Sequence, residues 1–171
     1  MKKNNIILIG FMGVGKGTVA RAIFKQTGRF SVDTDDIIES ITKKRIKDIF
    51  ADHGEPYFRD LEKQCALWLE KSIDNTIIST GGGFYRQENL KDIGTVIYLE
   101  NSFEGILRRI HNSPNAEKKL KKRPLLQNLE EAKKLYDVRV KEYESVADFV
   151  VNVEDRAEVD IVKEIFEKIE G

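Results

Sequence analysis

Residues 10–18 read Gly10-Phe11-Met12-Gly13-Val14-Gly15-Lys16-Gly17-Thr18, and this stretch decides the fold. It follows the apolar run 6–9 and precedes a segment with helical periodicity from residue 19. That context is typical of a phosphate-binding loop. Glycines let consecutive backbone N–H groups turn inward around anionic oxygens. The following helix adds the positive end of its dipole and Lys16 adds a mobile cation, so the stretch predicts a nucleotide site.

One position departs from the strict pattern G-x-x-x-x-G-K-[ST]. Gly17 stands where a hydroxyl side chain usually reaches Mg²⁺, and the hydroxyl comes one residue later, at Thr18. A glycine-rich turn with a chance lysine is the alternative interpretation of the stretch. The strand before it and the helix after it favour the phosphate site.

The composition indicates one soluble domain. A chain of 171 residues is long enough to bury roughly 70% of its unfolded surface. Its net charge of zero gives no long-range attraction to nucleic acid or anionic membranes. The lone Cys65 excludes an internal disulfide, and its apolar neighbours predict a core thiol rather than a nucleophile. We expect neither a signal peptide nor a membrane span, and therefore a cytoplasmic protein.

Short apolar runs alternate with helical stretches along the chain. The expected strands are 6–9, 30–32, 76–79, 95–99 and 149–153. The expected helices are 19–27, 36–41, 46–52, 57–72, 102–110, 129–145 and 159–169. In the helix 57–72, the residues Phe58, Leu61, Cys65 and Trp68 recur at helical spacing and predict its buried face. The alternation predicts a parallel, doubly wound α/β sheet of three layers (α/β/α), with ligands at the carboxyl ends of the strands.

The second predicted strand ends in the acidic segment Asp33-Thr34-Asp35-Asp36. If this segment is extended, the side chains of Asp33 and Asp35 point to the same side. One carboxylate near Mg²⁺ and one near an acceptor hydroxyl suit phosphoryl transfer. Helix capping by Asp33 or Asp36 is the alternative, and we assign it mainly to Asp36 and little to Asp35.

The third predicted strand ends in Ser79-Thr80-Gly81-Gly82-Gly83. Three consecutive glycines lose much conformational entropy on folding, so the backbone there must bend or approach another group closely. A small polar substrate resting on the N–H groups and a simple tight turn both fit this pattern.

Arginines are a further kind of candidate site residue. Arg59 lies three residues before Glu62 on a predicted helix, where the carboxylate can hold the guanidinium in place. Arg139 lies on the late helix 129–145. The planar guanidinium of arginine can bind a carboxylate through two hydrogen bonds, although a single arginine is more often a surface residue.

Arg123 closes a basic stretch that begins at residue 108. Residues 112–115 contain Asn, Ser and Pro and break the preceding helix, so the middle of the stretch predicts a mobile loop. The stretch fits a solvated charge run or a lid that closes over ATP and excludes water. An RNA-binding patch is disfavoured by the zero net charge and the lack of interleaved aromatic residues.

In order and spacing, these motifs resemble the shikimate kinases over residues 6–160. The matching segments are residues 10–16, Asp33-Thr34-Asp35, Phe58-Arg59-Asp60-Leu61-Glu62, Thr80-Gly81-Gly82-Gly83, Arg123-Pro124-Leu125-Leu126 and Arg139 with Tyr143 and Ala147-Asp148. The resemblance implies a five-stranded P-loop kinase domain over 1–171, with a substrate-binding insertion at about 34–62 and a mobile lid at about 110–125. It also implies a monomer that phosphorylates the 3-hydroxyl of shikimate with ATP and Mg²⁺.

The resemblance also implies roles for single residues. Catalytic roles fall to Lys16, Asp35 and Arg123. The ATP contacts are Gly13, Val14, Gly15, Lys16, Gly17, Thr18, Arg109, Arg123 and Arg156. The shikimate contacts are Asp35, Arg59, Gly81, Gly82, Gly83 and Arg139, and the metal-site residues are Asp33, through water, and Thr18.

Two other interpretations stay open. The sequence Gly-Lys-Gly-Thr is similar to adenylate kinases, so a nucleoside monophosphate kinase, or another small-molecule kinase such as a gluconate kinase, is the alternative activity. Against it, Gly83-Phe84-Tyr85-Arg86 stands where those kinases carry Gly-Phe-Pro-Arg. A regulatory module that binds ATP without turnover would leave the acids and arginines without a purpose.

Overall fold

The computed structural model describes residues 3–171. Its strands form one parallel sheet in the order β2-β3-β1-β4-β5. The strands are β1 (Ile6–Ile9), β2 (Ser31–Asp33), β3 (Ile77–Ser79), β4 (Thr95–Glu100) and β5 (Phe149–Asn152). Central β1 pairs with β3 and β4, so that Ile6 lies opposite both Ile77 and Thr95. The predicted five-stranded parallel sheet is confirmed.

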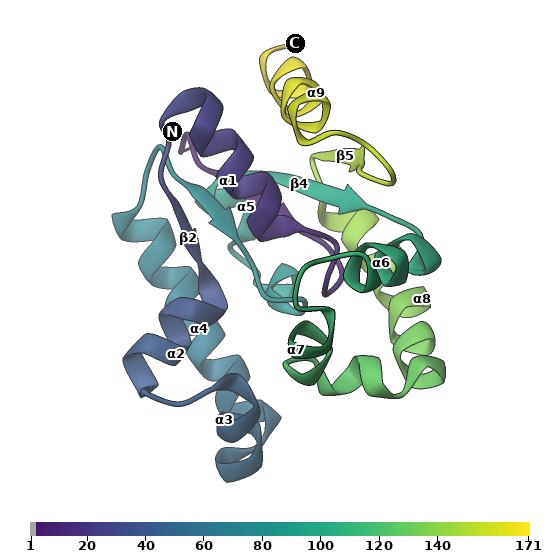
Figure 1. Cartoon of the computed structure of the whole chain (residues 1–171). Helices are drawn as coiled ribbons and strands as arrows, with labels where there is room; N and C mark the ends of the chain where they lie inside the picture. Colours follow the sequence, from purple (N-terminus) through teal and green to yellow (C-terminus); the bar gives the residue numbers. More distant parts are fainter. Residues whose placement is uncertain (1–2) are drawn as a thin grey trace.

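Helices cover both faces of the sheet (Figure 1). They are α1 (Lys16–Thr27), α2 (Thr34–Thr42), α3 (Ile46–His53), α4 (Glu55–Ser72), α5 (Leu90–Ile93), α6 (Phe103–His111), α7 (Ala116–Lys121), α8 (Leu129–Val146) and α9 (Glu158–Glu170), with short 3₁₀ turns η1 (Phe84–Arg86) and η2 (Pro124–Gln127). Helices α1 and α9 pack together on one face, and α5 and α8 contact β4 from the other. This is the expected three-layer α/β/α arrangement.

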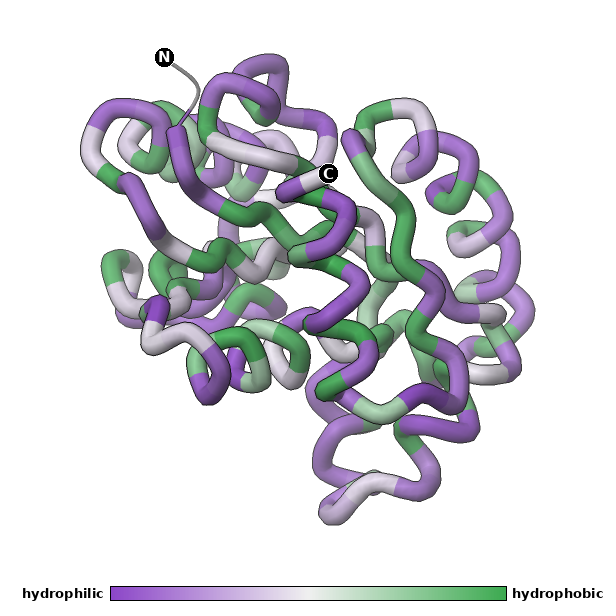
Figure 2. Tube along the Cα trace, turned by 90° about the horizontal axis from the view of Figure 1, so that it is seen from above, coloured by the Kyte–Doolittle hydropathy of each residue, from purple (hydrophilic) through white to green (hydrophobic). Residues whose placement is uncertain are grey.

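The core lies along the central strands, where every residue of β1 and β3 is buried. Figure 2 shows this as a hydrophobic interior surrounded by polar outer turns. A second, smaller cluster joins α2, α3 and α4 through Ile38, Ile49 and Phe58. No helix among residues 3–171 is long and apolar enough to cross a membrane.

Helix α4 buries a different face from the one predicted. Phe58 and Cys65 are buried as expected, but Trp68 is 43% exposed and Glu62 only 1%. The true buried stripe includes a carboxylate that pairs with an arginine of the same helix, and hydropathy gives no signal for such a pair. Burial raises the pKa of the Cys65 thiol to about 11, which fits the predicted inert core thiol.

Residues 116–121 also differ from the sequence prediction of a loop. They form α7, which begins after Asn115 in the left-handed conformation (φ 60°). The segment Ala-Glu-Lys-Lys-Leu-Lys consists of good helix formers, a local preference that its charge pattern obscured. Figure 1 shows α7 and α3 at the same end of the molecule, on opposite sides of the gap between ribbons.

Asn5, just before β1, joins the ends of α4 and α5 to the segment that precedes β3. The side chain is 1% exposed. Its amide nitrogen donates to the carbonyls of Ile73 and Ile93 at 3.0 and 2.8 Å, and its oxygen accepts from the amide of Thr76 at 3.0 Å. The side chain therefore satisfies buried backbone groups that sheet pairing leaves over.

We predict that Asn5→Ala lowers the free energy of unfolding by about 2–4 kcal/mol, because it removes the side-chain partner of the carbonyl of Ile93 and of the amide of Thr76, whereas the carbonyl of Ile73 still accepts from Lys3. Urea unfolding measures this change. The matched control is the neighbouring exposed residue, and Asn4→Ala should stay within about 0.5 kcal/mol of the wild type. Equal transition midpoints for the two variants would contradict the role of Asn5.

Candidate active site

The phosphate-binding loop connects β1 to α1 in a conformation that requires glycine. Gly10, Gly13 and Gly15 have φ values of 153°, 80° and 108°. A Cβ on Gly10 would lie 2.9 Å from the carbonyl oxygen of Leu99, so the loop is also packed tightly on β4. The Lys16 ammonium donates to the carbonyls of Gly10, at 2.6 Å, and Phe11, at 3.2 Å, and therefore lies folded across the loop.

The charged groups that act on Lys16 indicate that the predicted catalytic residues lie at one rim of the sheet. Burial lowers the pKa of Lys16 to about 8, while the carboxylates of Asp33 and Asp35 oppose this shift and the guanidinium groups of Arg123 and Arg139 add to it. Groups from β2, α2, α8 and the residue before η2 thus act on one ammonium at the carboxyl ends of the strands.

The acidic segment is not extended as the sequence analysis assumed. Strand β2 ends at Asp33, and Asp35 already lies in the first turn of α2. Asp33, not Asp36, is the helix cap: its Oδ1 accepts from the amides of Asp35 at 2.9 Å and Asp36 at 3.1 Å. A cap must immediately precede the helix, and the helix begins at Thr34, two residues earlier than predicted.

Asp35 is the most perturbed carboxyl group of the site. Its Oδ1 is buried without a hydrogen-bond partner in residues 3–171. Burial, followed by the nearby carboxylates of Asp33 and Glu62, raises the pKa of Asp35 to about 7, and Lys16 opposes this shift. A carboxyl group with this pKa can take up a proton at neutral pH.

The glycine segment 81–83 permits close contact rather than an unusual turn, because none of its glycines has positive φ. A Cβ built on each of them would collide with a different side chain: Asp35 at Gly81, Arg139 at Gly82 and Arg59 at Gly83. The segment does form a tight turn, in which the amide of Phe84 donates to the carbonyl of Gly81 at 3.1 Å, and contact with a substrate stays a prediction. The backbone brings together three side chains from α2, α4 and α8.

The two arginines beside the glycines are held differently. Arg59 donates to Glu62, as predicted, and also to Glu55 at 3.1 Å. Arg139 is 8% exposed, and its Nε is buried without a hydrogen-bond partner among the described residues. Unpaired polar atoms are rare in protein interiors, so Nε of Arg139 and Oδ1 of Asp35 indicate that a ligand completes this region.

Two further residues support the glycine segment. The buried hydroxyl of Thr34 accepts from the amide of Gly81 at 3.0 Å, and the hydroxyl of Tyr143 donates to the carbonyl of Gly82 at 2.7 Å. Sequence reasoning gave Thr34 no role. The only sequence feature that could have identified Thr34 is its position between the two candidate carboxylates Asp33 and Asp35.

A cavity of about 290 Å³ adjoins the phosphate-binding loop. Its wall includes Gly15 and Thr18 from the loop, Arg109 from α6 and Arg156 after β5. Arg109 donates to the carbonyl of Gly13 at 3.2 Å and to the hydroxyl of Thr18 at 2.9 Å. We call this cavity, lined by parts of the loop, α6 and the segment after β5, the loop-side cavity.

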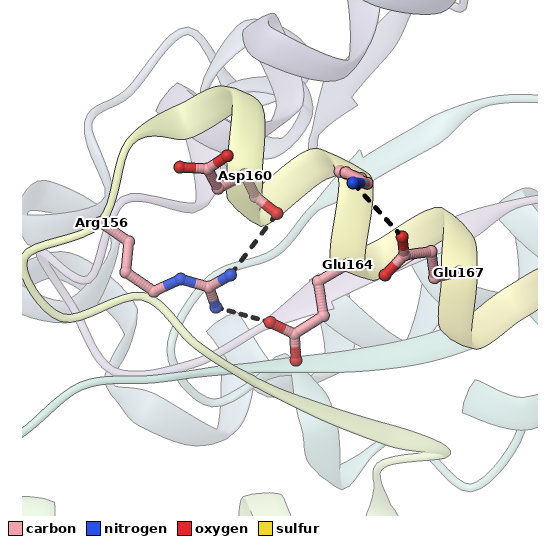
Figure 3. A pocket seen from close by; sticks show the side chains of 5 residues that line it. Arg156, Asp160, Glu164 and Glu167 are labelled. Atoms are coloured by element: carbon pink, nitrogen blue, oxygen red, sulfur yellow. Dashed lines mark hydrogen bonds and ion pairs between the residues drawn. The ribbon is translucent and has the colours of Figure 1, made fainter.

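Arg156 lies at the rim of the loop-side cavity. Figure 3 shows it on the loop before α9, beside Asp160, Glu164 and Glu167 of that helix, at a larger open hollow. It donates to Glu164 at 2.6 Å and to the carbonyl of Asn152 at 2.7 Å. Because the charges in that hollow pair with one another, the hollow offers fewer free groups than the loop-side cavity does.

Arg123 follows α7 and points back toward the loop. Its Nη1 donates to the carbonyl of Lys119 at 3.1 Å. Burial, followed by the charge of Arg109, lowers the pKa of Arg123. The guanidinium is therefore near both Arg109 and Lys16, whereas closure of the lid stays a prediction.

A divalent cation would find few protein ligands here. Residues 3–171 contain no group of three or more His, Cys, Asp or Glu side chains that could hold a metal. The Thr18 hydroxyl accepts from Arg109 and also from Arg21 at 3.3 Å. Asp33 commits Oδ1 to the helix cap, which leaves Oδ2 for a metal-bound water. This set fits Mg²⁺, which commonly keeps several waters and binds through few carboxylates and substrate phosphates.

Comparison with known proteins identifies the family. A family model described as shikimate kinase matches residues 12–170. The chain belongs to the shikimate kinase family. Shikimate kinases from Helicobacter hepaticus and Persephonella marina are 39% and 38% identical to it, over 95% and 96% of this chain and 94% and 98% of theirs.

Solved shikimate kinases share the fold. The protein from Acinetobacter baumannii, determined in complex with shikimate, matches with a TM-score of 0.84 at 34% identity, over 98% of this chain and 93% of that one. The protein from Aquifex aeolicus matches with a TM-score of 0.78 at 33% identity, over 98% and 96% of the two chains. The P-loop kinase fold is therefore that of the shikimate kinase family.

The raised pKa of Asp35 predicts a pH-dependent gain of stability in Asp35→Asn. The ordinary pKa is 3.8 and the folded-state pKa is about 7, so the protonated carboxyl stabilises the fold at low pH and this stability is lost as the pH rises to 7. The variant should exceed the wild type by roughly 2–4 kcal/mol at pH 8 and by almost nothing at pH 4.

Urea unfolding in EDTA at the two pH values measures the difference. Asp36→Asn is the matched control on the same helix turn, and it should give a much smaller gain at pH 8 because Asp36 is more exposed. A constant difference between Asp35→Asn and the wild type across this range would contradict the assignment.

Proposed function

We propose that this chain transfers the γ-phosphoryl group of ATP to the 3-hydroxyl of shikimate, giving shikimate 3-phosphate and ADP, in aromatic amino acid biosynthesis. The observation that carries the proposal is the group of unpaired buried atoms around the glycine segment 81–83, next to Lys16. Oδ1 of Asp35 needs a donor, and Nε of Arg139 needs an acceptor. Shikimate supplies both, through its ring hydroxyls and its carboxylate.

The substrate position follows from this complementarity. Arg59 and Arg139 present guanidinium donors toward the glycine segment and bind the carboxylate, while the Gly81, Gly82 and Gly83 backbone supports the ring. Asp35 accepts hydrogen bonds from ring hydroxyls at the opposite end. Glu62 keeps Arg59 oriented, since it is buried and paired with that arginine.

The chemical step is an in-line displacement. The 3-hydroxyl oxygen attacks the γ-phosphorus, the bond to the β–γ bridging oxygen breaks, and ADP leaves. Asp35 takes the hydroxyl proton, for which a pKa near 7 is suitable. Lys16 and Arg123 stabilise negative charge on the transferring group, and Lys16 keeps a third N–H donor beyond the two that bind the carbonyls of Gly10 and Phe11.

The nucleotide lies along the phosphate-binding loop. Gly13 to Thr18 hold the phosphates, and Arg109 and Arg156 border the adenine in the loop-side cavity. Mg²⁺, when bound, neutralises charge on the β- and γ-phosphate oxygens. Asp33 would hold it through water, and Thr18 would reach it only if its hydroxyl left Arg109 and Arg21.

The remaining features complete the proposal. Residues 1–171 act as one P-loop kinase domain, with residues 34–62 as the substrate-binding insertion and residues 110–125 as a mobile lid. The protein works as a cytoplasmic monomer on two small molecules, without a nucleic-acid or membrane partner. The buried free thiol of Cys65 and the zero net charge agree with this setting.

An acceptor screen tests the proposed reaction. Release of ADP from ATP and Mg²⁺ is followed with shikimate, gluconate, AMP or no acceptor. Only shikimate should raise the rate above the acceptor-free level. A response to AMP would favour the nucleoside monophosphate kinase, and a response to gluconate the gluconate kinase.

Arg139→Lys should raise the KM for shikimate at least tenfold, because lysine loses the planar fork that binds a carboxylate through two hydrogen bonds. The KM for ATP should change less than about twofold if Arg139 contacts only the acceptor. Steady-state kinetics with each substrate varied in turn measures both values. The matched control is Arg29→Lys, a partly buried arginine that follows α1; equal effects on both substrates in Arg139→Lys would refute carboxylate binding.

A further inference from the structure

Asn101 is a buried residue with an unsatisfied amide in the wall of the loop-side cavity. It follows β4 directly and is 3% exposed. The cavity is lined by Asn101 together with Gly15, Thr18 and Arg109. The side-chain amide makes no hydrogen bond within residues 3–171, and its Oδ1 is completely buried. Buried amides without partners are uncommon in folded proteins, so this one indicates a ligand that supplies the missing bonds.

A second observation concerns the residue that makes room for this amide. Gly105 lies in the first turns of α6, and a Cβ there would overlap Oδ1 of Asn101 and lie 2.7 Å from Oε1 of Glu154. Glycine within a helix is less favourable than alanine. The chain therefore has an unfavourable helix residue at the one place where a side chain would displace the amide of Asn101.

The backbone of Asn101 is held firmly. The hydroxyl of Tyr136 donates to its carbonyl oxygen at 2.6 Å, and Tyr136 itself packs edge-on against Phe11 of the phosphate-binding loop, with ring centroids 5.4 Å apart. The backbone from which the amide projects thus has a fixed position relative to the loop. A group fixed in this way is preorganised for recognition.

We propose that the side-chain amide of Asn101 recognises the base of the bound nucleotide and selects adenine. This inference rests on the proposed nucleotide site. The loop-side cavity continues from Gly15 and Thr18 of the phosphate-binding loop, so the part of a nucleoside triphosphate that enters it lies beyond the phosphates. The cavity also offers Arg109, whose planar guanidinium can stack on an aromatic base.

The chemistry of the amide matches adenine. An asparagine amide offers one acceptor and one donor side by side, which complements the amino group and adjacent ring nitrogen of adenine. Guanine carries a carbonyl oxygen in place of that amino group, so it would face the amide oxygen of Asn101 with a second acceptor. The mismatch leaves a buried acceptor unpaired and so disfavours GTP.

The test compares ATP with GTP at saturating shikimate. Wild-type protein should prefer ATP in kcat/KM by about tenfold or more, the range of one bidentate amide–base contact. Asn101→Leu is close in size but has no polar atoms, and it should reduce the preference to less than about threefold. Gly105→Ala, which displaces the amide, should act in the same direction.

Unfolding and binding measurements separate recognition from damage to the fold. Asn101→Leu without nucleotide should be at least as stable as the wild type, because it replaces an unpaired buried amide with an apolar group. The control Asn89→Leu removes an amide that does have partners, the carbonyl of Ala66 and Glu70, and it should keep the preference for ATP.

Calorimetric binding of ADP and GDP repeats the comparison without turnover. If Asn101→Leu keeps the wild-type preference for adenine, or if the wild type itself shows none, the inference is overturned, and the phosphorylation of shikimate stands. If shikimate is not phosphorylated, the proposed function fails, and the ratio of the ADP and GDP dissociation constants still decides the role of Asn101.

Discussion

The structure depends on the packing of charged side chains against a backbone that has no Cβ atoms. At residues 81–83 the chain comes so close to Asp35, Arg139 and Arg59 that any side chain on the glycines would collide with them. Each of these three groups comes from a different helix, so the glycine segment is the point at which α2, α8 and α4 meet. The acceptor site is shaped by this contact, with Thr34 and Tyr143 fixing its backbone.

This arrangement lowers the stability of the fold, but it keeps polar atoms available to bind ligands. Oδ1 of Asp35, Nε of Arg139 and Oδ1 of Asn101 are buried without hydrogen-bond partners among the described residues, and unpaired buried groups destabilise a fold. Continuous burial of β1 and β3 offsets that cost at the centre of the sheet. The unpaired atoms flank the phosphate-binding loop on its acceptor side and its loop-side cavity, which is where a bound substrate and nucleotide would satisfy them.

Local patterns predicted the regular elements well and the details of the site less well. The strand–loop–helix context around Lys16 and the alternation of apolar runs with amphipathic segments depend on neighbours in sequence, and they predicted the sheet and its main helices. The buried face of α4 was wrong because Glu62 is buried only through its pairing with Arg59. The assignment of the helix cap mainly to Asp36 was wrong because β2 ends at Asp33 and α2 begins at the next residue. A small error in this boundary changes the helix position of each carboxylate that follows it.

By itself the sequence determined the phosphate-binding loop, the parallel α/β class, the resemblance to shikimate kinases and the set of acids and arginines available for chemistry. Those features follow from residue type and short spacing. Only the tertiary structure decided which glycine faces which side chain, that Thr18 pairs with Arg109, and that Asn101 is buried over Gly105. These contacts join residues far apart in the chain, and their geometry follows from the packing of helices on the sheet.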